Sequence, residues 1–385
     1  MLRFMTAGES HGPGLVTIVE GLPRGLEISP DRITDELARR RMGYGRGKRM
    51  AIERDQIEIL GGIRHGETLG SPVSVLIRNT EWPRWSEEMS PEPAATKKQV
   101  TRPRPGHADL PGMLKYGTDD ARDILERASA RETAARTVAG VLAKVFLETV
   151  DVTIISHVIG IGPVTSEGAP PGPDDLEQVD SSPVRCFDPV AEAAMVEAIE
   201  DAKTQKDTLG GVFEVLGFAV PPGIGSHVHY DRKLDALLAG ALMSIPAIKG
   251  VEIGDGFEVA GLPGSKSHDE ILLGDSGLSR PTNRAGGTEG GISNGETIRA
   301  RAAMKPISTL MRPLRTVDMT TGEPAEAVRE RSDVCAVPAA AVVGEQMVAF
   351  VLASEFQRKF GGDTVDEFVA AVERYKSGLL GRPGG

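Results

Sequence analysis

A run of arginines between residues 39 and 49 is the clearest chemical signal in this chain of 385 residues. Six cations occur there with no acid among them, although the whole protein carries a net charge of −11. Gly43, Gly45 and Gly47 alternate with the later cations. Glycine lets the backbone approach a ligand closely, and guanidinium groups bind carboxylates and phosphates. The pattern predicts an anion site, while a solvated basic surface stays open as the alternative.

Two histidines stand in segments that could hold them for proton transfer. His107 follows two prolines, which stiffen the backbone ahead of a side chain that titrates near neutral pH. His11 is next to Ser10, but adjacent side chains point differently and do not form a Ser-His catalytic pair. Taken alone, His11 is more often structural, whereas for His107 a catalytic role and a local hydrogen bond are equally compatible with the sequence.

Two further segments have the composition of phosphate-binding loops. Residues 127–133 place small and hydroxyl side chains at the start of an Ala-rich helix, which suits a phosphate or close helix packing equally well. Residues 286–295 are glycine-rich, and Lys305 with nearby hydroxyls follows them, so they could cradle a phosphate or a flavin edge. The segment is not a Walker A motif, because GxxxxGK[ST] is absent.

Composition and missing motifs exclude several classes of function. The chain has no HExxH and no GxGxxG between a strand and a helix, so we expect neither a zinc protease site nor a Rossmann nicotinamide site. Cys186 and Cys335 lack metal-ligand spacing, so we expect no metal and a reducing, cytoplasmic location. Acidic charge and 4% aromatic residues argue against nucleic acid, and the absence of a long apolar run argues against a membrane span.

The elements that must position these residues alternate between strands and helices, which indicates an α/β or α+β class. Short Val- and Ile-rich runs predict strands at Leu15–Val19, Ile57–Leu60, Val73–Ile77, Val152–Ile161, Phe213–Val220 and Phe257–Ala260. Apolar periodicity and capping residues predict helices at Asp31–Arg41 with Ser29 as N-cap, Ala128–Glu148, Pro189–Lys203, Arg232–Met243, Ala339–Phe360 and a last one from Thr364, where Thr364 and Glu367 could form a capping box.

Two irregular segments separate these elements. Thr80–Thr101 contains both tryptophans, Trp82 and Trp85, and little periodicity, and we expect it to be a long loop over a site. Gly168–Pro183 is rich in Pro, Gly, Asp and Ser and is the one candidate for a domain boundary.

Together these segments resemble the chorismate synthase family from end to end. The resemblance is carried, in order, by GESHGPGLVTIVEGLP, RRRMGYGRGKRM, RPRPGHADLPGMLKYG, ERASARETAARTVAG, PAIKGVEIG, NRAGGTEGGISNGE, KPISTL and RSDVCAVPA. It implies an α+β fold, a β-α-β sandwich of antiparallel sheets and helices in one large domain over residues 1–385, assembled as a homotetramer.

The resemblance also implies a reaction. The family converts 5-enolpyruvylshikimate 3-phosphate to chorismate and phosphate by a 1,4-anti elimination, the last common step toward the aromatic amino acids. Reduced FMN is required without net oxidation, and some members reduce it with NADPH. An NAD(P)H-dependent flavin reductase and a non-catalytic anion-binding protein are the rival interpretations.

By resemblance, His11 protonates the departing phosphate, His107 protonates the reduced flavin, and Asp333 acts with the flavin in removing the substrate proton. The positions expected to bind substrate or NADP are Ser10, Arg40, Arg46, Arg104, Arg131 and Arg331. The positions expected to bind the flavin are Arg127, Ala128, Ser129, Pro246, Ala247, Gly290, Lys305, Pro306, Ile307, Ser308, Thr309 and Ser332.

The sequence departs from the family at two of these flavin positions. Pro246 stands where Gln or Asn is common, so a side-chain contact is lost there. Ala128 replaces a frequent Ser, where a backbone contact would survive.

Overall fold

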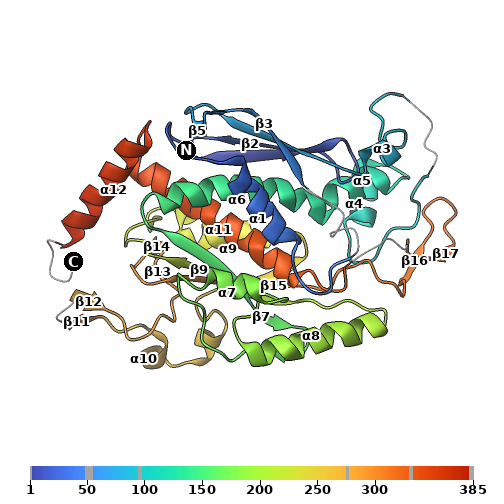
Figure 1. Ribbon diagram of the computed structural model, residues 1–385. Helices are drawn as coiled ribbons and strands as arrows, with labels where there is room; N and C mark the ends of the chain where they lie inside the picture. Colours follow the sequence, from blue (N-terminus) through green and yellow to red (C-terminus); the bar gives the residue numbers. More distant parts are fainter. Residues whose placement is uncertain (1, 48–54, 94–97, 275–276, 329–332, 381–385) are drawn as a thin grey trace.

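The computed structural model describes residues 2–47, 55–93, 98–274, 277–328 and 333–380 (Figure 1). Two antiparallel sheets enclose a layer of helices. The first sheet has the order β1 (Arg3–Ala7), β2 (Gly14–Glu20), β6 (Val73–Arg78) and β3 (Gln56–Gly61). The second has the order β10 (Ile248–Ile253), β15 (Ile298–Met304), β9 (Gly211–Phe218), β7 (Thr153–Ile161) and β8 (Val164–Thr165).

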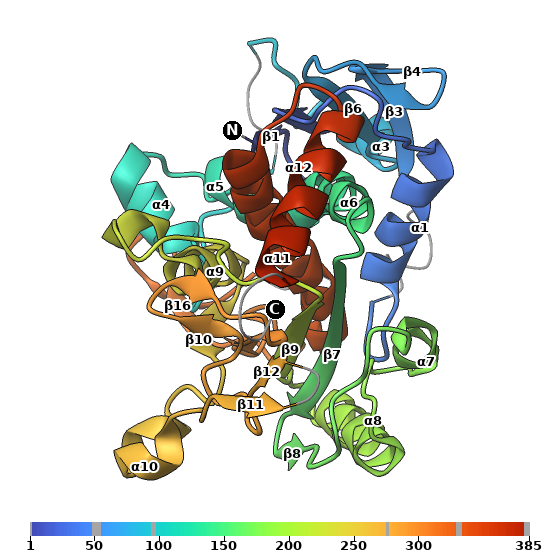
Figure 2. The same cartoon turned by 90° about the vertical axis from the view of Figure 1, so that its left-hand side faces the viewer.

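Two long helices fill the space between the sheets. Helix α6 (Thr133–Glu148) covers the first sheet, α11 (Val337–Phe360) covers the second, and the two helices pack on each other. Helix α1 (Pro30–Arg41) lies against both, and α9 (Leu234–Met243) lies beside α11 over β10. Helix α8 (Pro189–Thr204) contacts β7 and β8 outside the helix layer, and α12 (Val365–Leu380) follows α11 (Figure 2).

Shorter elements connect these layers. They are β4 (Ile63–Arg64), β5 (Glu67–Thr68), α3 (Trp82–Trp85), α4 (Asp109–Tyr116), α5 (Arg122–Ala128), η1 (Ala130–Glu132), α7 (Leu176–Ser181), η2 (Tyr230–Arg232), η3 (Glu258–Gly261), α10 (Gly264–Ser267), β11 (Leu272–Gly274), β12 (Gly277–Ser279), β13 (Thr288–Glu289), β14 (Ile292–Ser293), β16 (Arg315–Val317) and β17 (Pro324–Glu326).

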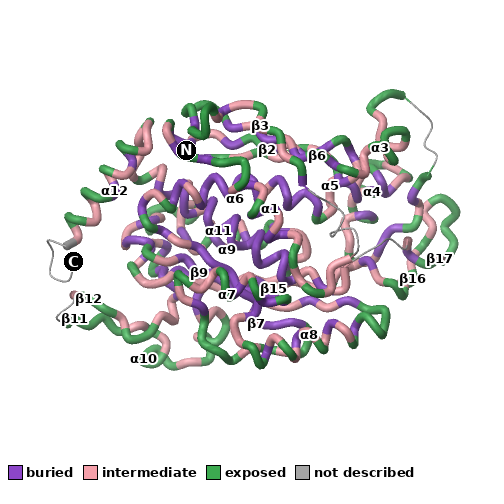
Figure 3. The backbone as a smooth tube through the Cα atoms, in the orientation of Figure 1, coloured by how far each residue is buried: buried purple, intermediate pink, exposed green. Residues whose placement is uncertain are grey.

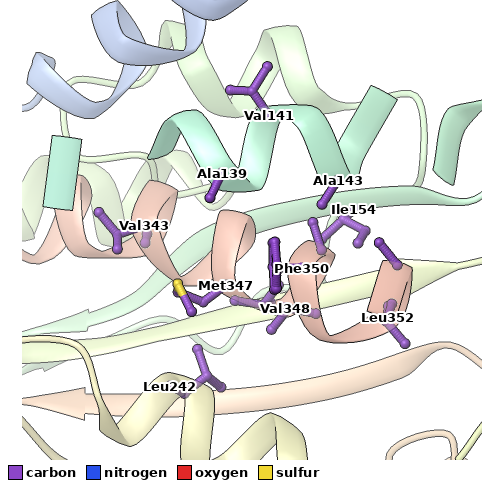
Figure 4. Packing of buried hydrophobic residues seen from close by; sticks show 14 of the residues in the cluster. Ala139, Val141, Ala143, Ile154, Leu242, Val343, Met347, Val348, Phe350 and Leu352 are labelled. Atoms are coloured by element: carbon purple, nitrogen blue, oxygen red, sulfur yellow. The ribbon is translucent and has the colours of Figure 1, made fainter. Parts of the chain in front are cut away.

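One apolar core joins both sheets to the helix layer. Its members run from Leu2 to Val372, and buried residues concentrate along α6, α11 and the strands that they cover (Figures 3 and 4). The helices approach closely because Gly140 faces Gln346, whose Cβ would lie 2.2 Å from a Cβ added at that glycine. Among the described residues, α11 alone has the length and composition of a membrane span, and 89% of that apolar window is buried within the fold, as in a core helix.

The predicted elements are largely observed, with boundaries shifted by a few residues. Ser29 caps α1 by accepting a hydrogen bond from Arg32 N, and Thr364 and Glu367 form the expected reciprocal capping box. The strand predicted at Phe257–Ala260 is wrong, because η3 forms there after a tight glycine turn. The helix predicted from Ala128 is divided into α5, η1 and α6. Strands β1, β10 and β15 were not predicted; β15 (IRARAAM) alternates with alanine and arginine instead of large apolar residues.

A buried ionic network ties the helix layer to the second sheet. Glu345 on α11 is fully buried and accepts hydrogen bonds from Arg39 (2.7 Å), Lys144 (2.5 Å) and Ser156 N (3.1 Å). Glu36 accepts from the same two cations, at 2.5 Å from Arg39 and 2.9 Å from Lys144. Burial alone would raise the pKa of Glu345, but Arg39 and Lys144 outweigh it and hold that pKa well below its usual range.

Replacing Glu345 by Gln should destabilise the protein strongly, because the substitution leaves Arg39 and Lys144 buried with less compensating charge. We expect a loss of about 3–5 kcal/mol in the free energy of unfolding at neutral pH, measured by urea denaturation. Because the folded-state pKa of Glu345 is lowered, its contribution is present near neutrality and is lost on acidification. The difference between E345Q and wild type should therefore shrink at low pH.

The control is Glu200→Gln on α8, which removes an exposed pair with Lys203. This variant should leave the free energy of unfolding almost unchanged, because solvent screens an exposed pair. Equal effects of the two substitutions would contradict the importance of the buried network.

Candidate functional site

The predicted site residues converge on a cavity of about 530 Å³ at one end of the helix layer. This volume is within the roughly 300–1,000 Å³ of typical small-molecule sites. Helices α6 and α11 both begin at its wall, with Thr133 and Ala339 in the lining. Their N-terminal ends carry partial positive charge, which favours an anionic ligand.

The polar wall of the cavity is strongly cationic in this acidic protein. Asp333 is the single carboxylate in the lining, among the residues that the structure describes. The basic side chains of the lining are Arg40, Arg46, Arg104, Arg131, Lys305, His11 and His107.

Asp55 holds two of these arginines from behind. Arg131 donates to Asp55 Oδ1 at 2.5 Å and to Asn79 Oδ1 at 3.2 Å. Arg40 lies 4.0 Å from Asp55 Oδ2 and donates to Thr133 Oγ1 at 3.2 Å, while Arg41 lies 3.6 Å from the same carboxylate. The buried Asp55 therefore lowers the repulsion among three guanidinium groups that lie close together.

The loop after α1 is joined to the segment before α11. Arg46 lies 2.6 Å from Asp333 Oδ2, and Gly47 N donates to Oδ1 at 2.6 Å. Val334 N donates to Gly45 O at 2.8 Å. Gly45 has φ +82°, and a Cβ there would come within 2.9 Å of Ile199, so glycine permits this close approach. These contacts fix the Asp333 carboxylate at the cavity wall.

His11 is held by groups from three segments. Its Nδ1 lies 2.7 Å from Glu126 Oε2 on α5 and 3.0 Å from Ser10 Oγ. The ring of Trp85 on α3 lies against the imidazole with centroids 4.2 Å apart. The predicted long loop over the site thus contacts His11 directly. Burial would raise the pKa of Glu126, but the hydrogen bond and charge of His11, with Arg122, hold it below its usual value.

His107 is held in the same way by Asp109. Its Nδ1 is hydrogen-bonded to Asp109 Oδ1, and Arg104 donates to Asp109 Oδ2 at 2.8 Å from Nε. Burial alone would raise the pKa of Asp109, but the hydrogen bonds from His107 and Arg104 hold it well below its usual range. Each histidine of the cavity therefore has an ionised carboxylate behind it and an arginine behind that carboxylate.

The lining also contains apolar side chains and backbone polar groups. The apolar lining comes from Leu125, Ala128, Ile245, Pro246, Met304, Ala336, Ala339, Ala340 and Val343. Ala247 has φ +69°, a strained conformation of the kind that gathers at functional sites, and its carbonyl accepts from Lys305 N at 3.0 Å. Lys305 also donates to Gly106 O beside His107. The apolar side chains can cover a flat ring of a ligand while the cations hold the anionic groups of that ligand.

Most of the predicted site residues lie together. The lining contains Ser10, His11, Arg40, Arg46, Arg104, His107, Ala128, Ser129, Arg131, Pro246, Ala247, Lys305, Pro306, Ile307, Ser308, Thr309 and Asp333. Arg127 is outside it and donates to Gly8 O and to Thr6. Gly290 is exposed in the turn of the β13–β14 hairpin, so the glycine-rich segment does not reach the cavity in this chain. Arg331 and Ser332 lie outside the described residues.

Sequence reasoning missed the acids that hold the site. Glu126 and Asp109 lie within the segments that carry the family resemblance, but no sequence pattern gives either of them a role, and none identifies Asp55. The spacing of Arg122 and Glu126 indicates a helical ion pair, yet it gives no sign of His11, which is 115 residues away. Arg39 belongs to the predicted basic cluster but faces the buried acids Glu36 and Glu345 instead.

The donor set suits anions and proton transfer. Within the described residues no group of three or more His, Cys, Asp or Glu side chains could hold a metal ion. The arrangement can bind several carboxylates or phosphates, exclude water with its apolar wall, and exchange protons at two histidines and one aspartate.

Comparison with known proteins gives a consistent result. A family model described as chorismate synthase matches residues 2–356. The chain is 59% identical to the chorismate synthase of Acidothermus cellulolyticus and 57% identical to that of Thermobifida fusca, in each case over 99% of this chain and 100% of the relative. A crystal structure of a chorismate synthase matches with a TM-score of 0.79 at 41% identity, over 98% of both chains.

Inorganic phosphate should stabilise the protein by binding at the cationic wall. We expect phosphate to raise the unfolding temperature above that in sodium chloride of equal ionic strength, because a ligand of the folded state adds to its stability. Arg131→Gln should lose at least half of this increase in a thermal-shift experiment. Arg78→Gln is the control, since Arg78 is exposed, pairs with Glu58 and is outside the lining. Identical increases in all three proteins would contradict an anion site here.

Proposed function

The chain belongs to the chorismate synthase family, and from this premise we propose that the cavity at the start of α6 and α11 is its active site. The protein is a lyase that converts 5-enolpyruvylshikimate 3-phosphate to chorismate and phosphate with a reduced flavin. The carbon–oxygen bond to phosphate and one carbon–hydrogen bond break, and a conjugated diene forms. The electrons of the broken C–H bond remain in the product, so there is no net oxidation.

The observation that carries this proposal is the gathering of cations in one cavity beside two carboxylate-backed histidines. The substrate has two carboxylates and a phosphate ester, and a flavin mononucleotide adds another phosphate. Buried charges of one sign cost several kcal/mol each unless they are paired. Arg40, Arg46, Arg104 and Arg131 supply compensating charge with geometry suited to carboxylate and phosphate.

The residues of the cavity also fit a flavin. The apolar wall from Leu125, Met304 and Val343 can cover the ring system, and the hydroxyls of Ser308 and Thr309 lie in the lining for its polar edge. Pro246 lines the cavity without a polar side chain, so any hydrogen bond at that turn comes from backbone. When bound, the reduced flavin supplies electron density transiently to the reacting ring as phosphate leaves.

We assign His11 as the acid for the leaving phosphate. Its Nδ1 is engaged with Glu126, so proton exchange with a ligand in the cavity goes through Nε2. An imidazole whose orientation is fixed in this way can donate a proton to a departing phosphate oxygen.

We assign Asp333 as the group that takes up the substrate proton and His107 as the proton donor toward the flavin. Arg46 and Gly47 N hold the Asp333 carboxylate in one orientation, so the substrate C–H can be placed against it. Asp109 fixes the ring of His107 through the hydrogen bond between Asp109 Oδ1 and His107 Nδ1. Two acids and one base at separate positions of one cavity meet the needs of an anti elimination.

The finer parts of the proposal are the cofactor and the assembly. We propose FMN as the flavin and NADPH as a reductant that Arg40 and Arg46 would bind, with Arg331 and Ser332, which lie outside the described residues, as further ligand contacts. We further propose that the chain is a single domain of the β-α-β sandwich type and that it assembles as a homotetramer in the cytoplasm. The succession of sheet, helix layer and sheet supports the sandwich description.

The direct test is anaerobic. Protein, dithionite-reduced FMN and 5-enolpyruvylshikimate 3-phosphate should give diene absorbance and free phosphate in equal amounts, and neither without reduced flavin. Replacing dithionite by NADPH shows whether the protein reduces its own flavin. Oxidation of NADPH without any diene would support a flavin reductase instead.

Replacing His107 by Ala should lower the turnover number at least about tenfold, because a positioned acid or base typically contributes two to four orders of magnitude. Flavin binding and the unfolding temperature should change little, because the side chain is at the surface of the cavity and not in the apolar core. His268→Ala, an exposed residue at the end of α10, is the control. Turnover at the wild-type rate in H107A would remove His107 from the mechanism.

A further inference from the structure

Glu126 is a buried carboxylate whose two oxygens bind one histidine and one arginine. Its side chain is 1% exposed, and its Oε2 lies 2.7 Å from His11 Nδ1 and accepts from His11 N at 3.1 Å. Its Oε1 accepts from Arg122 at 2.8 Å. Its backbone carbonyl accepts from Ser10 N at 3.0 Å, which ties the same loop to α5 a second time.

Trp85 completes the enclosure of His11. The indole lies against the imidazole, and the Arg122 guanidinium lies 4.9 Å from the indole centroid. Arg122 therefore contacts both partners of His11, the carboxylate and the aromatic ring. The ring of His11 is fixed at Nδ1 by Glu126 and along one face by Trp85, while the cavity takes the remaining side.

We propose that Glu126 is the positioning residue for His11: it binds the Nδ1 hydrogen, directs Nε2 to the cavity and stabilises the protonated ring. The proposal rests on the assignment of His11 as the acid for the leaving phosphate. A carboxylate can only accept hydrogen bonds, so the hydrogen of this pair is on the imidazole nitrogen. The low pKa of Glu126, which His11 and Arg122 maintain against burial, keeps the carboxylate ionised for this task.

The charges around His11 explain why such a residue is needed. The cavity presents Arg40, Arg46, Arg104 and Arg131, and positive charges disfavour a protonated imidazole. Arg122 on α5 is a further cation, while α3 contributes the uncharged Trp85 and the loop itself contributes Ser10. In the part of the chain that the structure describes, Glu126 meets the ring at hydrogen-bond distance, so its charge opposes those cations where the proton must be held.

Glu126→Gln separates this role from packing, because the amide has nearly the same shape. It removes the charge and can either donate to or accept from Nδ1, so the ring is no longer held with Nε2 toward the substrate. We expect kcat to fall at least about tenfold with KM within about twofold of wild type. Glu126→Asp, which keeps the charge at a greater distance, should recover part of the lost rate.

The pH dependence gives a signature that loss of packing would not. An acid must be protonated, so activity falls as pH rises. In E126Q this fall should come at lower pH than in wild type, because the opposing carboxylate charge is gone. Glu132→Gln is the matched control: this neighbouring buried carboxylate binds Arg136 and Thr6 and is outside the cavity lining, so rate and profile should stay as in wild type.

A second measurement needs neither flavin nor turnover. Diethyl pyrocarbonate modifies neutral imidazole, and peptide mass spectrometry resolves each histidine, with exposed His65 as reference in the same digest. In the protein without ligand, His11 should reach half-maximal modification at higher pH in wild type than in E126Q, while His65 stays the same. E132Q should follow wild type.

The outcomes separate this inference from the proposed function. If wild type forms no chorismate, the proposed function fails, and the modification experiment still tests the pairing of Glu126 with His11. If wild type is active but E126Q keeps its kcat, its pH profile and its His11 modification curve, the positioning role is overturned. A fall in kcat with an unshifted profile and modification curve would also overturn it, because the effect would then be structural.

Discussion

Repulsion among like charges is the constraint on which the site depends. Four arginines and a lysine line one cavity, and without counter-charges they would push the loops that carry them apart. The structure meets this with acids beside the cations. Asp55 holds Arg40 and Arg131 and Asp109 holds Arg104 from outside the lining, whereas Asp333 holds Arg46 from within it. The cationic face is thus open to ligands while its charge is partly balanced from the protein side.

The same principle connects the site to the core through α1. Arg39 and Arg40 are adjacent, so their side chains point in different directions around the helix. Arg39 joins Glu36, Lys144 and Glu345 in the buried network between α6 and α11, whereas Arg40 reaches the cavity beside Thr133. An ionic network deep in the core therefore sets the position of a helix whose last turn supplies a cation to the ligand.

The sequence predicted the elements of the fold better than their arrangement. Features that depend on a few neighbouring residues were predicted correctly, such as the Ser29 cap of α1 and the Thr364–Glu367 capping box. Strand β15 was missed because arginine and alanine occupy its alternating positions, and it is a strand because β9 and β10 pair with it on both sides. The prediction that the site residues lie together came from the family resemblance, because no spacing in the chain places His11 near residue 126 or Asp333 near Gly47.

The chain contains two tryptophans, both in the single turn of α3, and Trp85 lies against His11. All tryptophan emission of the protein therefore originates in this one helical turn. The emission of Trp85 depends on the ring that lies against it, so a change in the distance between the indole and the imidazole would change the emission intensity. The protein thus carries an intrinsic optical probe of the contact between Trp85 and His11, which needs no label and would respond if ligands that enter the cavity move either ring.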